Sequence, residues 1–216
     1  TIAYYDSYAE KFFSETQAVD MAPLHDRFLA HLPAGAHILD AGCGSGRDTK
    51  IFHAQGHRVT AFDASAELVA LAQTHTGLPI QHRCFSQVSE IAAYDGIWAC
   101  ASLLHLPESE LSSSLLCLWQ ALKPGGVFYL SFKYGESERQ HGGRHFTDAN
   151  ESRLAAWLTG IPDIVSSETW ITEDQRPDRS ERWLNALLFR APVPHEKLII
   201  GGRDHPFLPQ LSQAIA

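Results

Sequence analysis

The chain contains the sequence ILDAGCGSGRD at residues 38–48, where an apolar run ends in an acid and opens into a GxGxG loop. Glycines allow the sharp turn that such a loop needs and let a ligand approach the backbone closely. The helix expected after the loop directs free N–H groups and the positive end of its dipole at an anion. The stretch therefore predicts a nucleotide-type cofactor site at the end of a buried strand.

A second acid and the charge at the loop distinguish between two cofactors that share this geometry, a dinucleotide and S-adenosylmethionine. Asp63 follows the first loop glycine by about the 20 residues expected of an acid that binds a ribose. Asp40 would repel the pyrophosphate of a dinucleotide, whereas it attracts the ammonium and sulfonium of a methionine moiety. The methionine carboxylate can use the helix N-terminus, with Arg47 as a partner. Charge and spacing therefore favour S-adenosylmethionine.

An ordered set of motifs makes the chain resemble the class I S-adenosylmethionine-dependent methyltransferases. The motifs are LDAGCGSG at residues 39–46, Asp63, DGIWAC at residues 95–100 and LKPGGVF at residues 122–128. The chain looks most similar to small single-domain enzymes of the tellurite-resistance type and of quinone-pathway types. The resemblance implies S-adenosylmethionine as the cofactor and methylation of a small acceptor.

Strand and helix patterns alternate along the chain, which predicts a parallel sheet with helices on both faces. The expected strands lie near residues 37–41, 57–62, 79–84, 95–100 and 126–132, and the expected helices near residues 46–55, 65–75, 86–92, 108–122 and 148–158. Residues 164–172 and 182–189 predict two further strands around a polar turn. With the resemblance, the fold class is α/β: a Rossmann-like, doubly wound, seven-stranded sheet, mostly parallel with an antiparallel C-terminal hairpin.

Composition places the chain among ordinary globular proteins and argues against a broad polyanion-binding face. It has 216 residues, 44% of them hydrophobic and 19% charged, and a net charge of −8. Non-specific nucleic-acid binding depends on Lys and Arg residues that neutralise phosphates. The four cysteines form no CxxC pair, and no apolar run approaches the roughly 20 residues that span a bilayer. We therefore expect a cytoplasmic protein with reduced thiols and no membrane partner, and the composition disfavours a nucleic-acid partner.

We expect a methyltransferase domain over residues 1–190 and a C-terminal extension of unknown role over residues 191–216. About residues 1–30 form an N-terminal lid segment. Within it, Tyr4–Phe13 is dense in aromatic residues and looks like the lid that closes over the cofactor in many small-molecule methyltransferases. The alternative is a helix that packs its aromatic side chains against the sheet. Two roles stay open for the extension: a homodimer contact, or part of an additional domain.

The candidate cofactor-binding residues lie in the lid and where the first four strands end. They are Tyr5, Asp40, Gly42, Cys43, Gly44, Arg47, Asp48, Asp63, Ala64, Phe85, Cys100, Ala101 and Ser102. Small residues at 100–102 leave room for an acceptor atom to approach the methyl group in line. Two alternatives stay open: Asp63 as the cap of a helix that begins near Ser65, and Phe85 as core packing and not a wall for the purine.

His105 is the candidate catalytic residue, a general base whose unperturbed pKa lies near neutrality. A packing or surface role is the alternative, since the chain has 12 histidines. Tyr134 and Arg144 are the candidate substrate-binding residues. Other residues that could line the acceptor side are Lys133, Arg139, His141, His145, Trp183 and Asn185. We expect no metal, because Gly142-Gly143 makes a loop between His141 and His145 and no acid or Cys joins them at ligand spacing.

The sequence thus predicts S-adenosylmethionine-dependent methyl transfer to a small-molecule acceptor by direct displacement. Positive side chains at Lys133, Arg139 and Arg144 suggest an acceptor with an anionic or strongly polar group. Two alternatives remain: a methyltransferase that acts on tRNA or another nucleic acid, and a non-catalytic module that binds S-adenosylmethionine.

Overall fold

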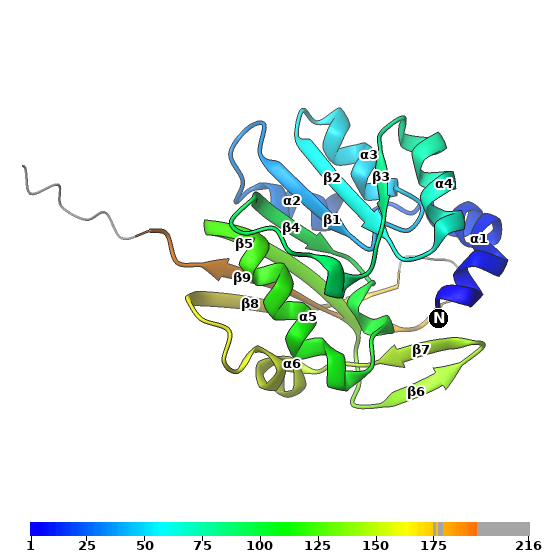
Figure 1. Ribbon diagram of the computed structural model, residues 1–216. Coiled ribbons are helices and arrows are strands. Elements are labelled where there is room, and N and C mark those ends of the chain that lie inside the picture. The colour runs from blue at the N-terminus through cyan, green and yellow to red at the C-terminus, as the bar shows by residue number, and fades with distance from the viewer. Residues whose placement is uncertain (175, 177–178, 194–216) are drawn as a thin grey trace, which may run out of the picture.

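A seven-stranded sheet runs through the molecule in the order β3-β2-β1-β4-β5-β9-β8 (Figure 1). The structure is a computed structural model that describes residues 1–174, 176 and 179–193. The strands are β1 His37–Ala41, β2 Arg58–Asp63, β3 Ile80–His82, β4 Tyr94–Ala99, β5 Leu122–Lys133, β8 Ile164–Glu173 and β9 Arg182–Arg190. β1 to β5 are parallel, and β9 is antiparallel to both β5 and β8. The fold class expected from the sequence is confirmed.

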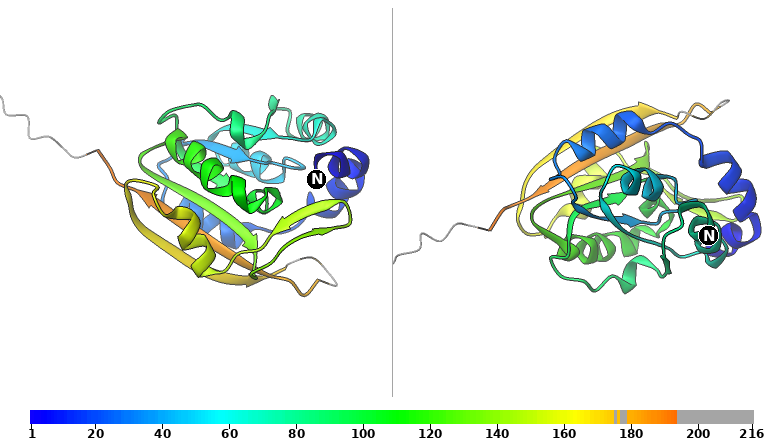
Figure 2. Two further views of the ribbon diagram at one scale, coloured as in Figure 1. Left: turned by 60° about the horizontal axis from the view of Figure 1, so that its bottom comes forward. Right: turned by 90° about the horizontal axis from the view of Figure 1, so that it is seen from above.

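Helices cover both faces of the sheet, and α1 lies at its edge (Figures 1 and 2). They are α1 Ile2–Thr16, α2 Ala22–Leu29, α3 Arg47–Ala54, α4 Ala66–Thr76, α5 Glu108–Ala121 and α6 Glu151–Leu158. On one face, α5 and α6 pack against Leu39, Ile97 and Phe128. On the other face, α2 and α3 pack against Ile38 and Trp98. Adjacent strand residues face opposite layers because side chains alternate across a sheet.

The prediction of a helix near residues 86–92 is wrong. Only a 3-10 turn, Phe85–Gln87, forms there. The backbone N–H groups of Ala92 and Ala93 donate to the carbonyl groups of Gln120 and Ala121 at 2.8 Å. Because these donors bond to the end of α5, they are not available to a helix of their own.

Two elements were not expected from the sequence. One is α2, and the other is a small two-stranded sheet of β6 Glu138–His141 and β7 Arg144–Thr147, joined by Gly142-Gly143. Both turn glycines have positive φ, as a tight hairpin requires. The hairpin lies beside α1 (Figure 2), and His145 N–H donates to Thr1 Oγ1 at 2.9 Å. These elements place α1 and β7 together at one end of the sheet.

Two further observations bear on the expectations above. No helix among the described residues combines the length and the apolar character that crossing a bilayer requires. The C-terminal extension expected over residues 191–216 lies, from residue 194 onward, outside the described residues.

Candidate functional site

The loops that follow β1 and β4 meet at the point where the strand order reverses, which is where ligands bind in open α/β sheets. Gly42 begins the first loop with φ +78°, and a Cβ atom there would lie 2.5 Å from Cβ of Ser102 in the second. Ser102 Oγ donates to the carbonyl of Ala41 at 2.7 Å. The two loops are therefore locked together, and only glycine fits at position 42.

Asp63 braces the glycine loop. Its Oδ2 accepts a hydrogen bond from Gly44 N–H and its Oδ1 accepts one from Ser65 N–H, each at 2.9 Å. Burial raises the pKa of Asp63, although the N–H donors oppose that shift. A carboxylate has about four acceptor positions, and the N–H groups of Gly44, Ser65 and Ala64 face this one, so its capacity is not exhausted. The cap of α4 is Ser65, whose Oγ accepts from Leu68 N–H at 3.2 Å.

Asp40 lies beneath the loop and does not line its surface. The pleat of β1 points its side chain toward α3, where Thr49 Oγ1 donates to it at 2.6 Å. Burial, followed by repulsion from Asp48, raises the pKa of Asp40 to about 8. The structure therefore places Asp40 behind Thr49 and not on the surface of the cavity.

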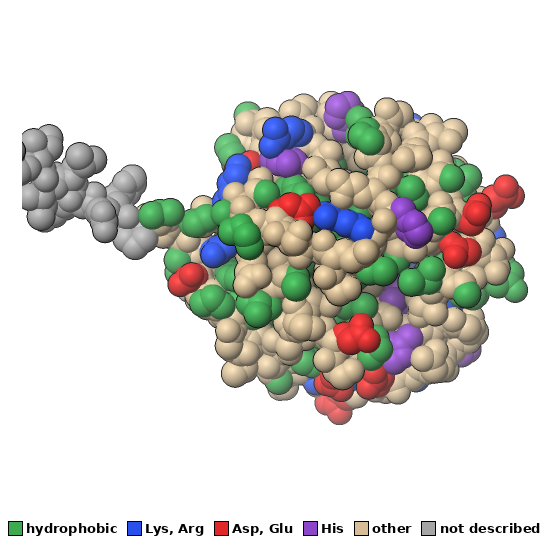
Figure 3. Space-filling view, viewed as in Figure 1, with side chains coloured by type: hydrophobic (Ala, Val, Ile, Leu, Met, Phe, Trp, Pro, Cys, Tyr) green, Lys and Arg blue, Asp and Glu red, His purple; other side chains and the backbone are tan. Residues whose placement is uncertain are grey.

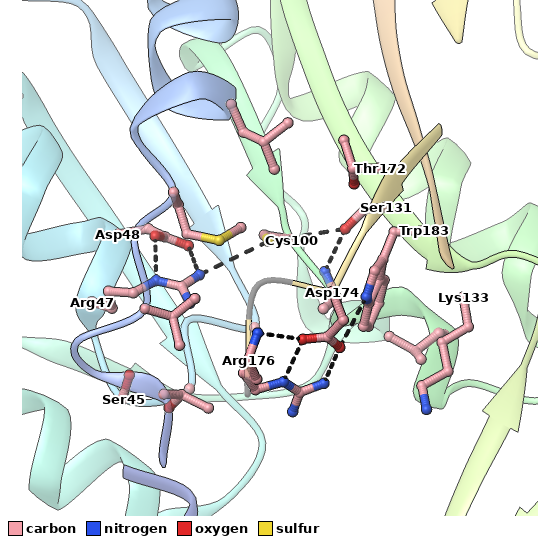
Figure 4. Close-up of a pocket in the computed structure, with 18 of the residues that line it drawn as sticks. Ser45, Arg47, Asp48, Cys100, Ser131, Lys133, Thr172, Asp174, Arg176 and Trp183 are labelled. Atoms are coloured by element: carbon pink, nitrogen blue, oxygen red, sulfur yellow. Dashed lines mark hydrogen bonds and ion pairs between the residues drawn. The ribbon is translucent and has the colours of Figure 1, made fainter. Parts of the chain in front are cut away.

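Arg47 presents its guanidinium to the cavity described below, held there by Asp48 (Figure 4). Its Nε and Nη2 donate to the two oxygens of Asp48, both at 2.8 Å. Asp48 also bonds to Trp98 Nε1 and His25 Nε2 at 2.9 Å. Burial opposes ionisation of Asp48, but Arg47 and His25 hold its pKa well below the usual range. Such a bidentate, fixed arginine suits recognition of a carboxylate.

One cavity of about 300 Å³ joins the glycine loop to the ends of β4, β5, β7 and β8 and to α1. The predicted site residues that line it are Tyr5, Gly42, Cys43, Gly44, Arg47, Asp48, Cys100, Ala101, His105 and Arg144. Those that do not line it are Asp40, Asp63, Ala64, Phe85, Ser102 and Tyr134. The cavity therefore brings most of the predicted residues together around one space.

Three of the residues outside the cavity have other partners. Phe85 packs edge-on against Phe62 with ring centroids 5.4 Å apart. The carbonyl of Ala64 accepts from His82 Nε2 at 3.1 Å. Tyr134 Oη donates to Glu151 at 3.2 Å, away from the cavity, so nothing in its position supports the expected substrate contact.

His105 lies between α1 and the β6–β7 hairpin. Its Nδ1 bonds to the carbonyl of His145 at 2.8 Å, and its Nε2 bonds to Tyr5 Oη at 2.7 Å. A carbonyl only accepts, so Nδ1 carries the proton and Nε2 accepts from Tyr5. Burial lowers the pKa of His105 to about 4, with Arg144 and Lys133 adding to the effect and the His145 carbonyl opposing it. The imidazole is therefore neutral near pH 7.

Helix α1 spans the cavity and is attached on both sides of it. On the loop side, a Cβ atom on Gly44 would lie 3.1 Å from the ring of Phe12, and Ser65 Oγ donates to Asp6 at 2.6 Å. On the opposite side, Tyr5 bonds to His105. Such a position fits the lid expected from the sequence.

Several lining residues were not singled out from the sequence. Tyr129 and Ser131 come from β5, Phe146 from β7, and Asp174 and Arg176 from the segment after β8 (Figure 4). The period-two alternation of β5 would have found the first two, since Lys133 continues the same face. Among the described residues, no group of three or more His, Cys, Asp or Glu could hold a metal ion.

Comparison with known proteins agrees with this geometry. Residues 38–126 match a family described as a methyltransferase domain. The ubiquinone biosynthesis O-methyltransferase of Xanthomonas axonopodis pv. citri is 31% identical over 150 residues, which cover 58% of this chain and 62% of that protein. The chain thus spans about three fifths of the length of this curated relative.

Solved structures show the same fold. The 1,6-didemethyltoxoflavin-N1-methyltransferase of Burkholderia thailandensis, solved with 1,6-didemethyltoxoflavin and S-adenosylhomocysteine bound, is 28% identical with a TM-score of 0.68. The match covers 88% of this chain and 85% of that one. A TehB-like methyltransferase of Corynebacterium glutamicum, 24% identical with a TM-score of 0.63 over 88% of this chain and all of that one, shares the fold.

The fold is Rossmann-like, with a nucleotide-type cofactor site. This class is defined by the strand order, by the glycine loop after β1 and by Asp63, which holds that loop in place. The family match over residues 38–126 and the structural likeness narrow that class to a methyltransferase domain similar to the S-adenosylmethionine-dependent methyltransferases. The residues present fit that cofactor. Gly42, Cys43 and Gly44 line the cavity, Arg47 offers a fixed cation for a carboxylate, and Asp63 lies directly behind the loop.

Proposed function

We propose that the chain transfers a methyl group from S-adenosylmethionine to a small-molecule acceptor by direct displacement. The observation that carries this proposal is the single cavity that contains both the glycine loop and the Tyr5–His105 pair. Two reactants held at these places would share one enclosed space. Alignment of bound reactants is a large part of the rate enhancement that such a site can supply.

The residues around the loop hold and orient the cofactor in this proposal. Arg47 binds the methionine carboxylate, and Asp63 accepts from the ribose hydroxyls. When bound, S-adenosylmethionine supplies an electrophilic methyl group on a sulfonium. Transfer forms a bond between the acceptor atom and the methyl carbon and breaks the carbon–sulfur bond, whose electron pair stays on sulfur. Ala101 and Cys100 keep the approach to that carbon open by their small size.

His105 is the proposed proton acceptor where the acceptor atom carries a proton. Its Nε2 has the required lone pair, because Nδ1–H is fixed on the carbonyl of His145. A base whose pKa is about 4 holds a proton weakly. It therefore suits an acceptor that is acidic, or one that loses its proton as the new bond forms. Tyr5 must move aside, since its hydroxyl occupies Nε2.

A small acceptor is favoured over a nucleic acid by enclosure and by charge. Helix α1 and the β6–β7 hairpin flank the cavity, and this arrangement suits a small ligand better than a polymer. The face in Figure 3 carries Lys and Arg side chains scattered among acidic and neutral ones. Two of the basic side chains near the site are ion-paired: Lys133 with Glu181 and Arg139 with Asp148.

The test is methyl transfer by the purified chain from S-adenosylmethionine labelled on its methyl group. Separate reactions contain a small-molecule cell extract, total tRNA or duplex DNA. We expect label in the small-molecule products, S-adenosylhomocysteine as co-product, and loss of both in Gly42→Val, which fills the loop. Label in tRNA or DNA alone would establish the nucleic-acid alternative. Cofactor binding without turnover on any fraction would establish a binding module.

A further inference from the structure

The cavity contains five basic side chains, and four of them already have a carboxylate partner. Arg47 pairs with Asp48 and Arg176 with Asp174. Lys133 and Arg179 both pair with Glu181, at 2.9 and 3.7 Å. Three carboxylates thus serve these four cations, so each cation is at least partly offset, and Arg47 is the one proposed above for the methionine carboxylate. Arg144 is the remaining one.

Arg144 makes no ion pair with a described residue. Its guanidinium lies over the rings of Tyr4 and Phe146, 4.6 and 5.0 Å from their centroids. The guanidinium of Arg144 has a hydrogen-bond partner nearby, the hydroxyl of Tyr5. The Nε atom is buried and has no partner among the described residues. A guanidinium carries five N–H donors, and one hydroxyl cannot satisfy them. The rings of Tyr4 and Phe146 thus hold the guanidinium of Arg144 in place, and no described carboxylate pairs with it.

The walls around Arg144 are aromatic. Tyr5, Phe146, Tyr129 and Trp183 line the cavity from α1, β7, β5 and β9. Phe146 and Tyr129 are almost fully buried. Flat rings of this kind pack against planar ligands through stacked and edge-on contacts. The chamber therefore combines apolar aromatic walls with a guanidinium, beside Tyr5 and His105, that has no carboxylate partner among the described residues.

We propose that Arg144 binds the negative charge of the methyl acceptor, and that the acceptor is therefore a planar aromatic anion. This inference rests on the proposed function and specifies its substrate class. A carboxylate or an ionised ring oxygen on such a molecule pairs with Arg144, while the ring occupies the aromatic chamber. Both Arg144 and Nε2 of His105 face the hydroxyl of Tyr5. An acceptor held by Arg144 therefore lies against Nε2 once Tyr5 has moved aside.

Calorimetry with matched pairs of ligands tests this directly. Benzoate is compared with benzamide, and 2-naphthoate with 2-naphthamide, on the full chain saturated with S-adenosylhomocysteine. The pairs have nearly equal shape and differ in charge. We expect each anion to bind about tenfold or more tightly than its amide, the range of a charge-assisted hydrogen bond. Arg144→Gln should remove this preference, and Arg144→Lys should keep part of it.

Arg27→Gln is the matched control. Arg27 also lies over an aromatic ring, 3.7 Å from the centroid of Trp170, but it pairs with Glu168 and does not line the cavity. This variant should keep the preference for anions. No preference in the wild-type chain, including no binding of either anion, overturns the inference, as does a preference that survives Arg144→Gln. Failure to bind S-adenosylhomocysteine would instead contradict the proposed function.

Discussion

The hydroxyl of Tyr5 lies 2.7 Å from Nε2 of His105, so the N-terminal helix is fastened to the proposed proton acceptor. The two residues are 100 positions apart in the chain. Because this bond occupies the only free lone pair of His105, the acceptor can reach Nε2 only when Tyr5 moves aside. A shift of α1 or a rotation of the Tyr5 side chain therefore exposes the base.

Tyr5→Phe should loosen α1. Loss of one hydrogen bond worth about 1 kcal/mol raises the open population about fivefold, so amide exchange across Ile2–Thr16 should accelerate by that factor. Tyr8→Phe is the control, since Tyr8 lies on the same helix and is 51% exposed. Mass-spectrometric hydrogen exchange measures both. Unchanged exchange in Tyr5→Phe would show that packing of Phe12 and Asp6 alone holds the helix.

Binding of S-adenosylhomocysteine should slow exchange across α1 in the wild-type chain. A helix that must open to admit ligand and then packs over the loop is more protected in the complex. Peptides from α5, none of whose residues lines the cavity, provide the internal reference. Equal exchange in the free and bound states would favour the purely structural alternative for this segment.

Asp63→Ala should lower both stability and cofactor affinity. Two backbone N–H groups, of Gly44 and Ser65, lose their acceptor. This costs about 1–3 kcal/mol of unfolding free energy, or roughly 2–10 °C in melting temperature for a chain of this size. Affinity for S-adenosylhomocysteine should fall about tenfold or more, as expected when hydrogen bonds to a charged group are lost. Melting curves and calorimetry separate the effects, and unchanged affinity would refute the ribose contact.

Binding of S-adenosylmethionine should release protons near pH 7. Asp40 is mostly protonated there, because its pKa is about 8. The ammonium and sulfonium favour the carboxylate and lower that pKa, so a proton leaves as the ligand binds. Calorimetry in two buffers with different ionisation enthalpies measures the number released. Asp40→Asn should abolish the release, whereas proton uptake in the wild-type chain would contradict the assignment.

His105 should titrate near pH 4. Its pKa is lowered mainly by burial, so the native state resists protonation more than the unfolded state does. The contribution of His105 to stability is therefore complete above about pH 6.5 and is lost as the pH falls toward 4. NMR titration of the imidazole resonances, with His105→Gln to identify the signal, checks the midpoint. A midpoint between about 6 and 7 would show that the side chain is hydrated.

The sequence by itself determined the cofactor loop and the sheet that carries it. Glycine spacing, the acids at strand ends and alternating apolar runs are local patterns, and local patterns follow from backbone sterics and side-chain periodicity. The seven-stranded, mostly parallel sheet and its antiparallel ending followed from these patterns and from the resemblance, whereas the strand order came from the structure. The same reasoning wrongly predicted a helix at residues 86–92. The backbone N–H groups of Ala92 and Ala93 instead bond to carbonyl groups at the end of α5, which lies about 28 residues further along the chain.

Only the tertiary structure decided which side chains share the cavity. Asp40 turns away from it because of the pleat of β1, and Tyr134 pairs elsewhere with Glu151. Lys133 and Arg144 look equivalent in the sequence, yet only Lys133 has a carboxylate partner among the described residues. The partners of a side chain lie on elements far apart in the chain, so charge balance and burial become visible only when those elements pack together.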